Sequence, residues 1–371
     1  MKNKLNTIEE VLLMGPGPSS VYPEVYKALA RPTLGHLDPA FIAIMDEIKE
    51  MLKTLMNTEN RLTIPISGTG SAGMETCFVN IVEPGDEVLI LQNGVFGMRM
   101  ADVASRLGAR VDILEFDWGT PVVVDQVEAK LKSKNYTLVG VVHAETSTGV
   151  KNPMDAIASA VGKTDALFLV DAVTSLGGIE VKADEWQVDA LYSGTQKCLS
   201  CPPGLSPATF SDRAVEKIKN RATKVPNWYL DLTMIINYWE GATRAYHHTA
   251  PINMLYGLYQ SLFTILEEGV DNVHKRHMDA HLALVEALKK LDIEMLVDEK
   301  FRLPMLNAVK VPDGVDEAVV RQTLLKDHKI EIGAGLGSLA GKVWRIGLMG
   351  HTAQQESIDR LTTALSRSLK A

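Results

Sequence analysis

Apolar and polar positions follow two different periods along the chain. Residues 41–56 carry apolar side chains at intervals of three and four, which predicts an amphipathic helix. Short, continuous apolar runs predict buried strands at residues 62–66, 87–91, 138–143, 166–170 and 190–192. Helical patterns separate them at residues 72–82, 125–131 and 153–161. This alternation indicates an α/β protein with a largely parallel sheet and helices on both faces.

The pattern changes near residue 255, where long amphipathic helices begin. The expected elements are helices at 255–268 and 270–291, strands near 308–311 and 343–346, and a last helix at 354–369. We therefore predict a second, smaller α+β domain. The predicted divisions are an N-terminal arm at 1–14, a large domain at 15–269 and a small C-terminal domain at 270–371.

Composition excludes several classes of protein. The 371 residues, 46% hydrophobic and 23% charged, are enough to bury a full core. A net charge of -8 without a run of Lys and Arg argues against a nucleic-acid partner. No apolar stretch is long enough to span a bilayer, and residues 11–14 are too short for a signal peptide. Three cysteines do not make a disulfide framework, so we expect a cytoplasmic protein.

An amine and a carboxylate follow two of the predicted strands. Asp171 ends the apolar run at 166–170, and Lys197 lies 26 positions later, after the run at 190–192. Alone, such a Lys is usually a solvated charge and such an Asp a turn residue. Together they suit a pyridoxal phosphate enzyme, because the amine can form a Schiff base with the cofactor aldehyde while the carboxylate keeps the pyridine nitrogen protonated.

A glycine-rich turn at residues 68–73 lies between a predicted strand and a predicted helix and matches GxGxxG. A dinucleotide-binding fold would need an acidic residue at the end of the next strand, where this chain has Gln92 and Asn93. We predict instead that backbone N–H groups and the Thr69 and Ser71 hydroxyls bind a single phosphate at the helix N-terminus. A turn that only allows close packing remains the alternative.

Two further patterns suggest a metal or redox site. Cys198 and Cys201 have CxxC spacing, but no second pair of ligands and no small βαβ context accompany them. His247 and His248 are adjacent, so their rings point in different directions, and no carboxylate cluster completes a metal shell. We therefore predict no metal site.

A series of short blocks occurs in a fixed order along nearly the whole chain. They lie at residues 15–19, 67–70, 83–86, 93–94, 147–149, 170–175, 192–197, 202–204, 246–249 and 345–347. In these blocks the chain resembles the alanine–glyoxylate and serine–pyruvate aminotransferases, in the class V branch of pyridoxal phosphate enzymes. The resemblance implies an aspartate-aminotransferase-like fold (fold type I), with a mainly parallel-sheet α/β/α domain and a smaller C-terminal α+β domain.

The resemblance also implies how the cofactor is held. Lys197 is the expected Schiff-base lysine and Asp171 the partner of the ring nitrogen. The phosphate is expected to contact Thr69, Gly70, Ser71 and Gln196, and also Tyr246 and Thr249 of the neighbouring subunit. Two subunits would then share each site, so a homodimer is expected.

Other residues are expected around the ring and the substrate. The resemblance places Phe96 on one ring face, Val173 on the other and Thr146 near the ring hydroxyl, with Arg345 and Gly17 at the substrate. Close relatives can have Trp at the position of Phe96, His at that of Ser71 and Ser at that of Thr146.

The resulting hypothesis is a ping-pong transamination. An amino group moves from a small amino acid, alanine or serine, to glyoxylate or pyruvate, and the freed Lys197 amine transfers the proton. Three alternatives remain: a lyase or desulfurase of the same fold, a relative that uses ureidoglycine, 3-hydroxykynurenine or aminoethylphosphonate, and a noncatalytic module that binds a phosphorylated metabolite.

Overall fold

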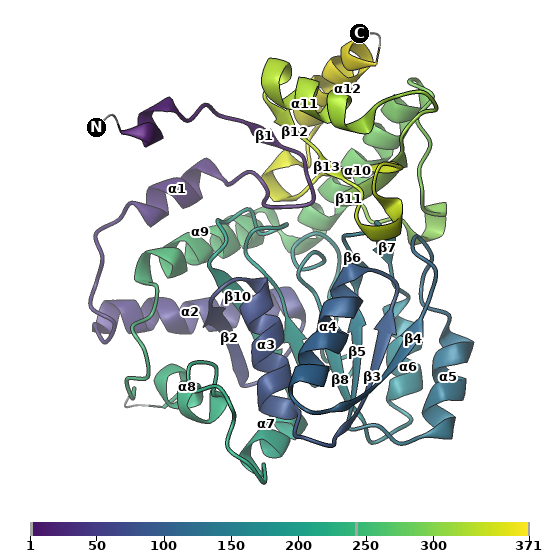
Figure 1. The fold of residues 1–371 in the computed structure, drawn as a ribbon. Helices are drawn as coiled ribbons and strands as arrows, with labels where there is room; N and C mark the ends of the chain where they lie inside the picture. Colours follow the sequence, from purple (N-terminus) through teal and green to yellow (C-terminus); the bar gives the residue numbers. More distant parts are fainter. Residues whose placement is uncertain (1–2, 242–243, 370–371) are drawn as a thin grey trace.

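A seven-stranded sheet forms the centre of the protein in the computed structural model, which describes residues 3–241 and 244–369 (Figure 1). Its strand order is β2-β10-β9-β8-β5-β3-β4. The strands are β2 (Leu62–Ser67), β3 (Glu87–Gln92), β4 (Arg110–Glu115), β5 (Leu138–Val142), β8 (Leu167–Asp171), β9 (Ala190–Tyr192) and β10 (Leu205–Phe210). Only β10 runs antiparallel to its neighbours in this sheet. The predicted, largely parallel sheet is confirmed.

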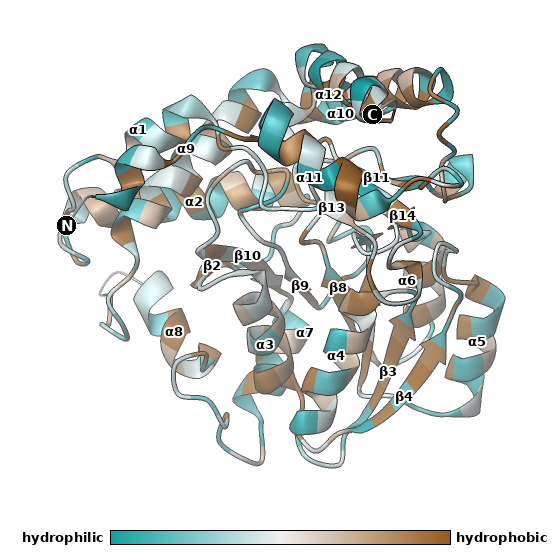
Figure 2. Ribbon diagram, turned by 45° about the horizontal axis from the view of Figure 1, so that its top comes forward, coloured by the Kyte–Doolittle hydropathy of each residue, from teal (hydrophilic) through white to brown (hydrophobic). Residues whose placement is uncertain are grey.

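Helices cover both faces of this sheet. α3 and α4 lie on one face, and α5 and α6 lie on the other, as right-handed crossovers between parallel strands require (Figure 1). The helices of this part are α1 (Pro23–Leu29), α2 (Pro39–Met56), α3 (Gly70–Ile81), α4 (Val95–Arg106), α5 (Val124–Ser133), α6 (Met154–Val161), α7 (Asp212–Lys219), α8 (Leu232–Trp239) and α9 (Ile252–Glu268). Figure 2 shows strands β3 and β4 as mostly hydrophobic and the surrounding helices as mixed.

Helix α2 shows how the sequence sets these elements. Asp38 caps its start by accepting a hydrogen bond from the Ala40 N–H at 2.8 Å, and Asn57 ends it in the left-handed conformation. Its apolar side chains at helical spacing are buried in the main core, among them Phe41, Met45, Ile48 and Leu52. The helix predicted at 41–56 is thus confirmed, and its apolar stripe is the face that packs.

The C-terminal part has its own sheet and its own core. Its elements are α10 (Val270–Lys289), β11 (Leu306–Lys310), α11 (Glu317–His328), β12 (Ile330–Glu331), β13 (Gly333–Ala334), β14 (Val343–Gly347) and α12 (Gln355–Ser368). Strands β11, β14 and β13 form an antiparallel sheet, and β1 (Leu12–Leu13) pairs in parallel with β12. Met14 and Trp344 belong to a hydrophobic cluster separate from the main core. The domain boundaries at residues 14 and 269 stay predictions.

Some elements were not predicted from the sequence pattern. Strand β10 contains Pro207, and Pro lacks the N–H that a strand interior uses. Strand β4 is an edge strand that pairs with β3 alone, and its side chains are only partly buried, so its apolar run is short. Helix α4 follows Gly94 directly and has little overall hydrophobicity to mark it. Helix α3 begins at Gly70, two residues before the predicted start.

The parallel strands place their carboxyl ends along one edge of the sheet. Asp171 is the last residue of β8, and Lys197 lies in the turn that follows β9. The turns after β2 and β3 lead into α3 and α4 at the same edge. Ligands of open α/β sheets bind at this edge. Within the described ranges, no helix is both long enough and apolar enough to cross a membrane.

Candidate active site

Lys197 lies in a buried position at the carboxyl edge of the sheet. Its Nζ donates a hydrogen bond to the carbonyl of Pro16, and only 7% of the residue is exposed. The Ser19 hydroxyl donates a hydrogen bond to the backbone carbonyl of Lys197 at 2.6 Å. The pKa of the Lys197 amine is lowered to about 8, chiefly by burial; Arg345 also lowers it, while Cys198, Asp171 and Glu145 act in the opposite direction. The amine therefore has a sizeable neutral fraction near neutral pH.

Asp171 lies on the strand next to the one that leads to Lys197. Strands β8 and β9 pair in parallel, with Asp171 opposite Tyr192. The two carboxylate oxygens accept hydrogen bonds from the Val173 N–H at 2.8 Å and from the Tyr192 hydroxyl at 2.7 Å. Burial raises the pKa of Asp171 to about 6, against the effect of these two bonds and of Lys197. The carboxylate is ionised at neutral pH, and among the described residues its hydrogen bonds come from neutral groups.

The turn at the start of α3 leaves hydrogen-bond donors free. Thr69 is the N-cap residue, but its side chain makes no capping hydrogen bond. The first backbone N–H groups of a helix have no acceptor within it, and they favour an anion. The side chains of Thr69 and Ser71 are exposed beside them. A Cβ at Gly70 would lie 3.2 Å from Val173 Cγ2, so this turn packs against the residue two positions after Asp171.

Gln196 brings a further polar group to this region. Its Oε1 is buried and has no hydrogen-bond partner in the part of the chain that the structure describes. A Cβ at Gly194 would lie 2.8 Å from that atom. Buried amide groups are nearly always hydrogen-bonded in proteins. Gln196 Oε1 is thus an acceptor without a donor, while the Nε2 of the same amide is the group that could donate to an anion.

Phe96, Thr146 and Val173 are brought to the same edge by three different segments. Phe96 is the second residue of α4, and its N–H donates to Glu145 Oε2 at 3.2 Å. Thr146 follows Glu145, and its hydroxyl lies 3.3 Å from the hydroxyl of Thr174. Val173 is partly buried and packs against the main core. The structure thus brings together the three residues that the family resemblance places around the cofactor ring.

Arg345 comes from β14 of the C-terminal sheet and reaches the same region. Its Nη1 donates to the Thr146 carbonyl at 3.2 Å, and its Nε donates to the Ala334 carbonyl at 2.7 Å. Burial lowers the pKa of Arg345 to about 10, so the guanidinium stays positive at neutral pH. Both of these hydrogen bonds go to neutral carbonyls, and among the described residues the Glu145 charge acts on the guanidinium only electrostatically. A buried cation whose hydrogen bonds go to neutral groups suits a substrate carboxylate.

Gly17 packs directly against Lys197. It has a φ of +109°, and a Cβ built there would lie 2.7 Å from Lys197 Nζ. A side chain at this position would occupy the space of the amine. Gly17 therefore contributes to the site by having no side chain, which leaves space for the Lys197 amine.

Tyr246 and Thr249 lie away from these residues. Their hydroxyls are 3.2 Å apart, and 57% of Tyr246 is exposed. The Tyr246 ring packs near His36 at 4.9 Å between ring centres. Between them, His248 turns inward, where its Nε2 lies 2.8 Å from the hydroxyl of Ser67, just before the glycine-rich turn. Within one chain, Tyr246 and Thr249 thus face outward.

Comparison with known proteins identifies the family. The profile of Aminotransferase class-V matches residues 19–361 of this chain. The chain belongs to the class-V aminotransferases. The rat alanine–glyoxylate aminotransferase is 40% identical over 367 residues, which cover 98% of this chain and 89% of that protein. The family expected from the motifs is confirmed.

Two solved structures of this family match over nearly the whole chain. The crystal structure of alanine–glyoxylate aminotransferase from Nostoc sp. is 45% identical, with a TM-score of 0.95 and coverage of 100% of both chains. The structure of ureidoglycine–glyoxylate aminotransferase from Bacillus subtilis is 39% identical, with a TM-score of 0.96, and covers 98% of this chain and 94% of that one. The expected fold, the aspartate-aminotransferase-like fold type I, is confirmed.

Class-V aminotransferases are pyridoxal phosphate enzymes, and the residues at this edge fit that cofactor. The chain offers a buried anion at Asp171 whose hydrogen bonds come from neutral groups, which suits a protonated ring nitrogen. It offers a buried amine at Lys197, and unpaired donors at the start of α3 that suit a phosphate. The unpaired amide of Gln196 lies in the turn just before that amine.

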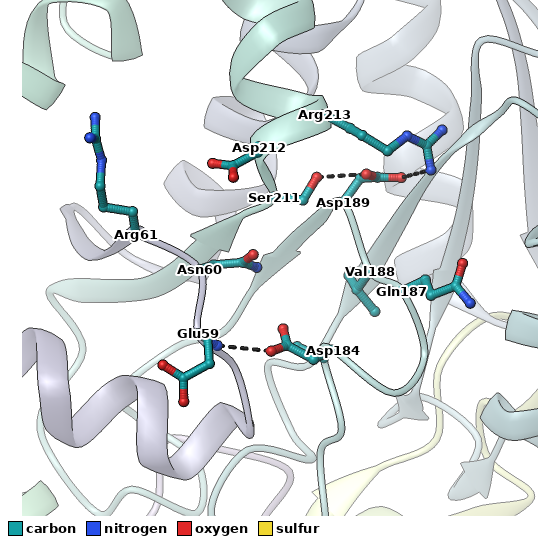
Figure 3. A pocket seen from close by; sticks show the side chains of 11 residues that line it. Glu59, Asn60, Arg61, Asp184, Gln187, Val188, Asp189, Ser211, Asp212 and Arg213 are labelled. Atoms are coloured by element: carbon teal, nitrogen blue, oxygen red, sulfur yellow. Dashed lines mark hydrogen bonds and ion pairs between the residues drawn. The ribbon is translucent and has the colours of Figure 1, made fainter.

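The aminotransferase has another cavity that is not this site. A cavity of about 560 Å³ is lined by residues that include Arg61, Asp184, Asp189 and Arg213 (Figure 3). Asp189 directly precedes β9 and Arg61 directly precedes β2, so this cavity lies at the amino ends of the parallel strands. There Asp189 pairs with Arg213 at 3.4 Å. The cavity is therefore at the opposite edge of the sheet from Lys197.

Three residues of the site were not found from the sequence. Glu145 is fully buried in β6 (Ala144–Glu145), which forms a two-stranded hairpin with β7 (Val150–Lys151). Tyr192 donates to Asp171, and the Pro16 carbonyl accepts from Lys197. A sequence signal existed only for Glu145, an acidic residue three positions after the buried strand β5. The Tyr192 hydroxyl and the Pro16 carbonyl reach the site only because distant segments of the chain lie together, and sequence patterns do not reveal this.

Proposed function

We propose that this aminotransferase moves an amino group from a small amino acid, alanine or serine, to glyoxylate or pyruvate. The observation that supports it most is the buried Arg345 guanidinium, whose hydrogen bonds in the described residues go to neutral carbonyls and which lies in the region of Lys197. A single such cation suits substrates that carry one carboxylate. The names of the relatives support glyoxylate as acceptor, because the alanine and ureidoglycine enzymes share it.

Each residue of the site has a proposed task. Bound pyridoxal phosphate supplies an electron sink that stabilises negative charge on the α-carbon of the substrate. Asp171 would hold the ring nitrogen, with its carboxylate fixed by Val173 and Tyr192. Lys197 would attach the cofactor and, once released, carry the proton of the α-carbon on its Nζ. Phe96, Val173 and Thr146 would hold the ring.

The acidity of Lys197 supports this task. An unperturbed Lys amine has a pKa of about 10.4, so only about 1 in 2,500 molecules is neutral at pH 7. With a pKa of about 8, roughly one molecule in ten is neutral at pH 7. A general base works best when its pKa is near the working pH. Burial of the amine thus makes Lys197 a usable base.

The phosphate would be held from two chains. In one chain, Thr69, Gly70, Ser71 and Gln196 are proposed to contact it, supported by the free donors at the start of α3. Exposed Tyr246 and Thr249 of the second subunit would complete the site. We accordingly propose a homodimer with shared active sites.

We also propose a cytoplasmic location, supported by the free state of all three cysteines. The same cysteines argue against a desulfurase. Cys77, Cys198 and Cys201 are buried, and burial raises the pKa of each thiol, for Cys198 to about 12. A reactive cysteine needs exposure and a low pKa.

Ureidoglycine is a second candidate donor, favoured by the 39% identity to the ureidoglycine–glyoxylate aminotransferase. A panel of donors decides between the candidates: alanine, serine, ureidoglycine, 3-hydroxykynurenine and aminoethylphosphonate, each with glyoxylate and with pyruvate. We expect the highest kcat/KM with alanine or serine and glyoxylate. Lys197→Ala is the control and should be inactive with every pair. Preference for another donor, or turnover without an oxo-acid acceptor, would contradict the proposal.

A further inference from the structure

Glu145 is a buried acidic residue with no task in the proposed reaction. Its side chain is fully buried, at the point where β6 begins the hairpin after β5. Oε1 accepts hydrogen bonds from the Ser147 N–H at 3.0 Å and the Ser147 hydroxyl at 2.6 Å. Oε2 accepts one from the Phe96 N–H at 3.2 Å. A buried carboxylate is costly unless donors surround it, so this one is fixed in position.

The same contacts form the start of α4. Its N-cap residue is Gly94, which has no side chain to accept from the first turn. The Ser147 hydroxyl accepts from the Val95 N–H at 3.0 Å, and Glu145 accepts from the N–H of Phe96. Ser147 and Glu145, which lie in another segment of the chain, thus take the place of an N-cap side chain. The negative charge of Glu145 is favourable at the N-terminal end of the helix dipole. Gly94 leaves space for the Glu145 side chain, because a Cβ there would lie 2.5 Å from Glu145 Cγ.

Several charged groups surround Glu145. Asp171 from β8 and Tyr192 from β9 are close enough to interact with it electrostatically, as are Lys197 and Arg345. The Glu145 charge raises the pKa of both cations. On α4, the Arg99 guanidinium lies 4.9 Å from the centre of the Phe96 ring. Glu145 therefore joins the start of α4 to the charged centre of the site.

We propose that Glu145 is a positioning residue for the cofactor: its ionised carboxylate fixes the first turn of α4 and thereby holds the Phe96 ring in the site. This inference rests on the role proposed above for Phe96. The pKa of Glu145 is raised to about 7, chiefly by burial and to a smaller extent by Asp171, against the hydrogen bonds from Ser147 and Phe96. Protonation below that pH weakens the acceptor of the Phe96 N–H. Cofactor affinity should therefore fall as the pH decreases through about 7.

The test measures binding of pyridoxal phosphate to the full-length apoprotein, by absorbance and fluorescence titration between about pH 6 and pH 8.5. Glu145→Gln keeps the size of the side chain and removes its charge. We expect its Kd at pH 8 to rise about tenfold, the usual effect of losing a helix cap. Its affinity should also depend less on pH around 7 than that of the wild type.

Ser147→Ala is the matched control, because it removes two hydrogen bonds of the same cluster and keeps the charge. It should bind more weakly than the wild type and keep the full pH dependence, with its midpoint moved above about 7, because the hydrogen bond from the Ser147 hydroxyl lowers the pKa of Glu145. If Glu145→Gln does not fold, Glu145→Asp serves instead, and it should combine weaker binding with a retained pH dependence.

Three results would overturn the inference. In the first, Glu145→Gln binds within twofold of the wild type and with the same pH dependence. In the second, Ser147→Ala loses the pH dependence as well. In the third, the wild type does not bind the cofactor at all, which would overturn the site assignments together with the role of Glu145. Only the first two results leave the proposed function intact.

Discussion

Gly17→Ala tests how tightly the N-terminal segment holds Lys197. An alanine Cβ at this position would lie 2.7 Å from Nζ and 2.8 Å from Cδ of Lys197. Carbon atoms in contact are ordinarily about 3.5 to 4 Å apart, so the lysine side chain must move by about 1 Å. A displacement of about 1 Å in a reacting group can lower the rate about 100-fold. That corresponds to a barrier about 2.7 kcal/mol higher.

The substitution has a second effect that must be separated from the first. The φ of Gly17 is +109°, and an L-residue in a positive-φ conformation is strained by about 1 to 2 kcal/mol. Gly85 offers a matched control, because its φ is +90° and no atom lies within 4 Å of its Cβ position. Gly85→Ala carries similar strain and leaves Lys197 untouched.

The assay combines thermal unfolding with steady-state kinetics at saturating pyridoxal phosphate. Both variants should unfold a few degrees lower than the wild type, about 2 to 4 °C for each 1 kcal/mol. Only Gly17→Ala should lose about 100-fold in kcat/KM. Values of kcat/KM within threefold of each other for the two variants would refute the idea that Gly17 reserves the space of the lysine amine.

Three further outcomes follow from the site. The rate at which the apoprotein captures pyridoxal phosphate, measured by stopped-flow absorbance, should rise nearly tenfold per pH unit below about pH 8 and level off above it, because only the neutral Lys197 amine reacts. A rate that keeps rising to about pH 10 would contradict the lowered pKa of Lys197. Asp171→Asn should still bind the cofactor but lose roughly 100-fold or more in kcat, because a neutral amide does not hold the ring proton; wild-type turnover would remove Asp171 from its role. Thr249→Ala and Lys197→Ala should each be inactive or weak alone, and a mixture of the two should recover activity through hybrid dimers; a mixture without recovery would argue against sites shared between subunits.

The sequence predicted those parts of the site that depend on residue type and strand order. Asp171 and Lys197 could be placed together because each follows a buried apolar run, and parallel strands end at the same edge of a sheet. The glycine-rich turn predicted the start of α3 within two residues. These predictions relied on local patterns of about five residues, which the fold preserves.

The remaining parts depend on contacts between distant segments. Strand β10 was missed because Pro207 and the polar Ser206 and Thr209 leave it without an apolar run, yet the strand is buried between β2 and β9. The carbonyl of Pro16 contacts Lys197 from far along the chain, and a carbonyl is common to every residue type. Glu145 was missed because an isolated acidic residue after a strand normally indicates an exposed turn, whereas here three donors allow its burial.

The N-terminal segment has a mechanical consequence. Met14 accepts a hydrogen bond from the Gly347 N–H at 2.7 Å and so is tied to the strand that carries Arg345. Ser19 is tied to the other sheet, since its N–H donates to the Gln196 carbonyl at 2.8 Å. A movement of one part against the other would therefore strain residues 15–18, together with direct contacts between the parts such as the hydrogen bond from the His351 N–H to the Ser200 hydroxyl. Since Pro16 and Gly17 touch Lys197, such a strain would reach the reactive amine itself.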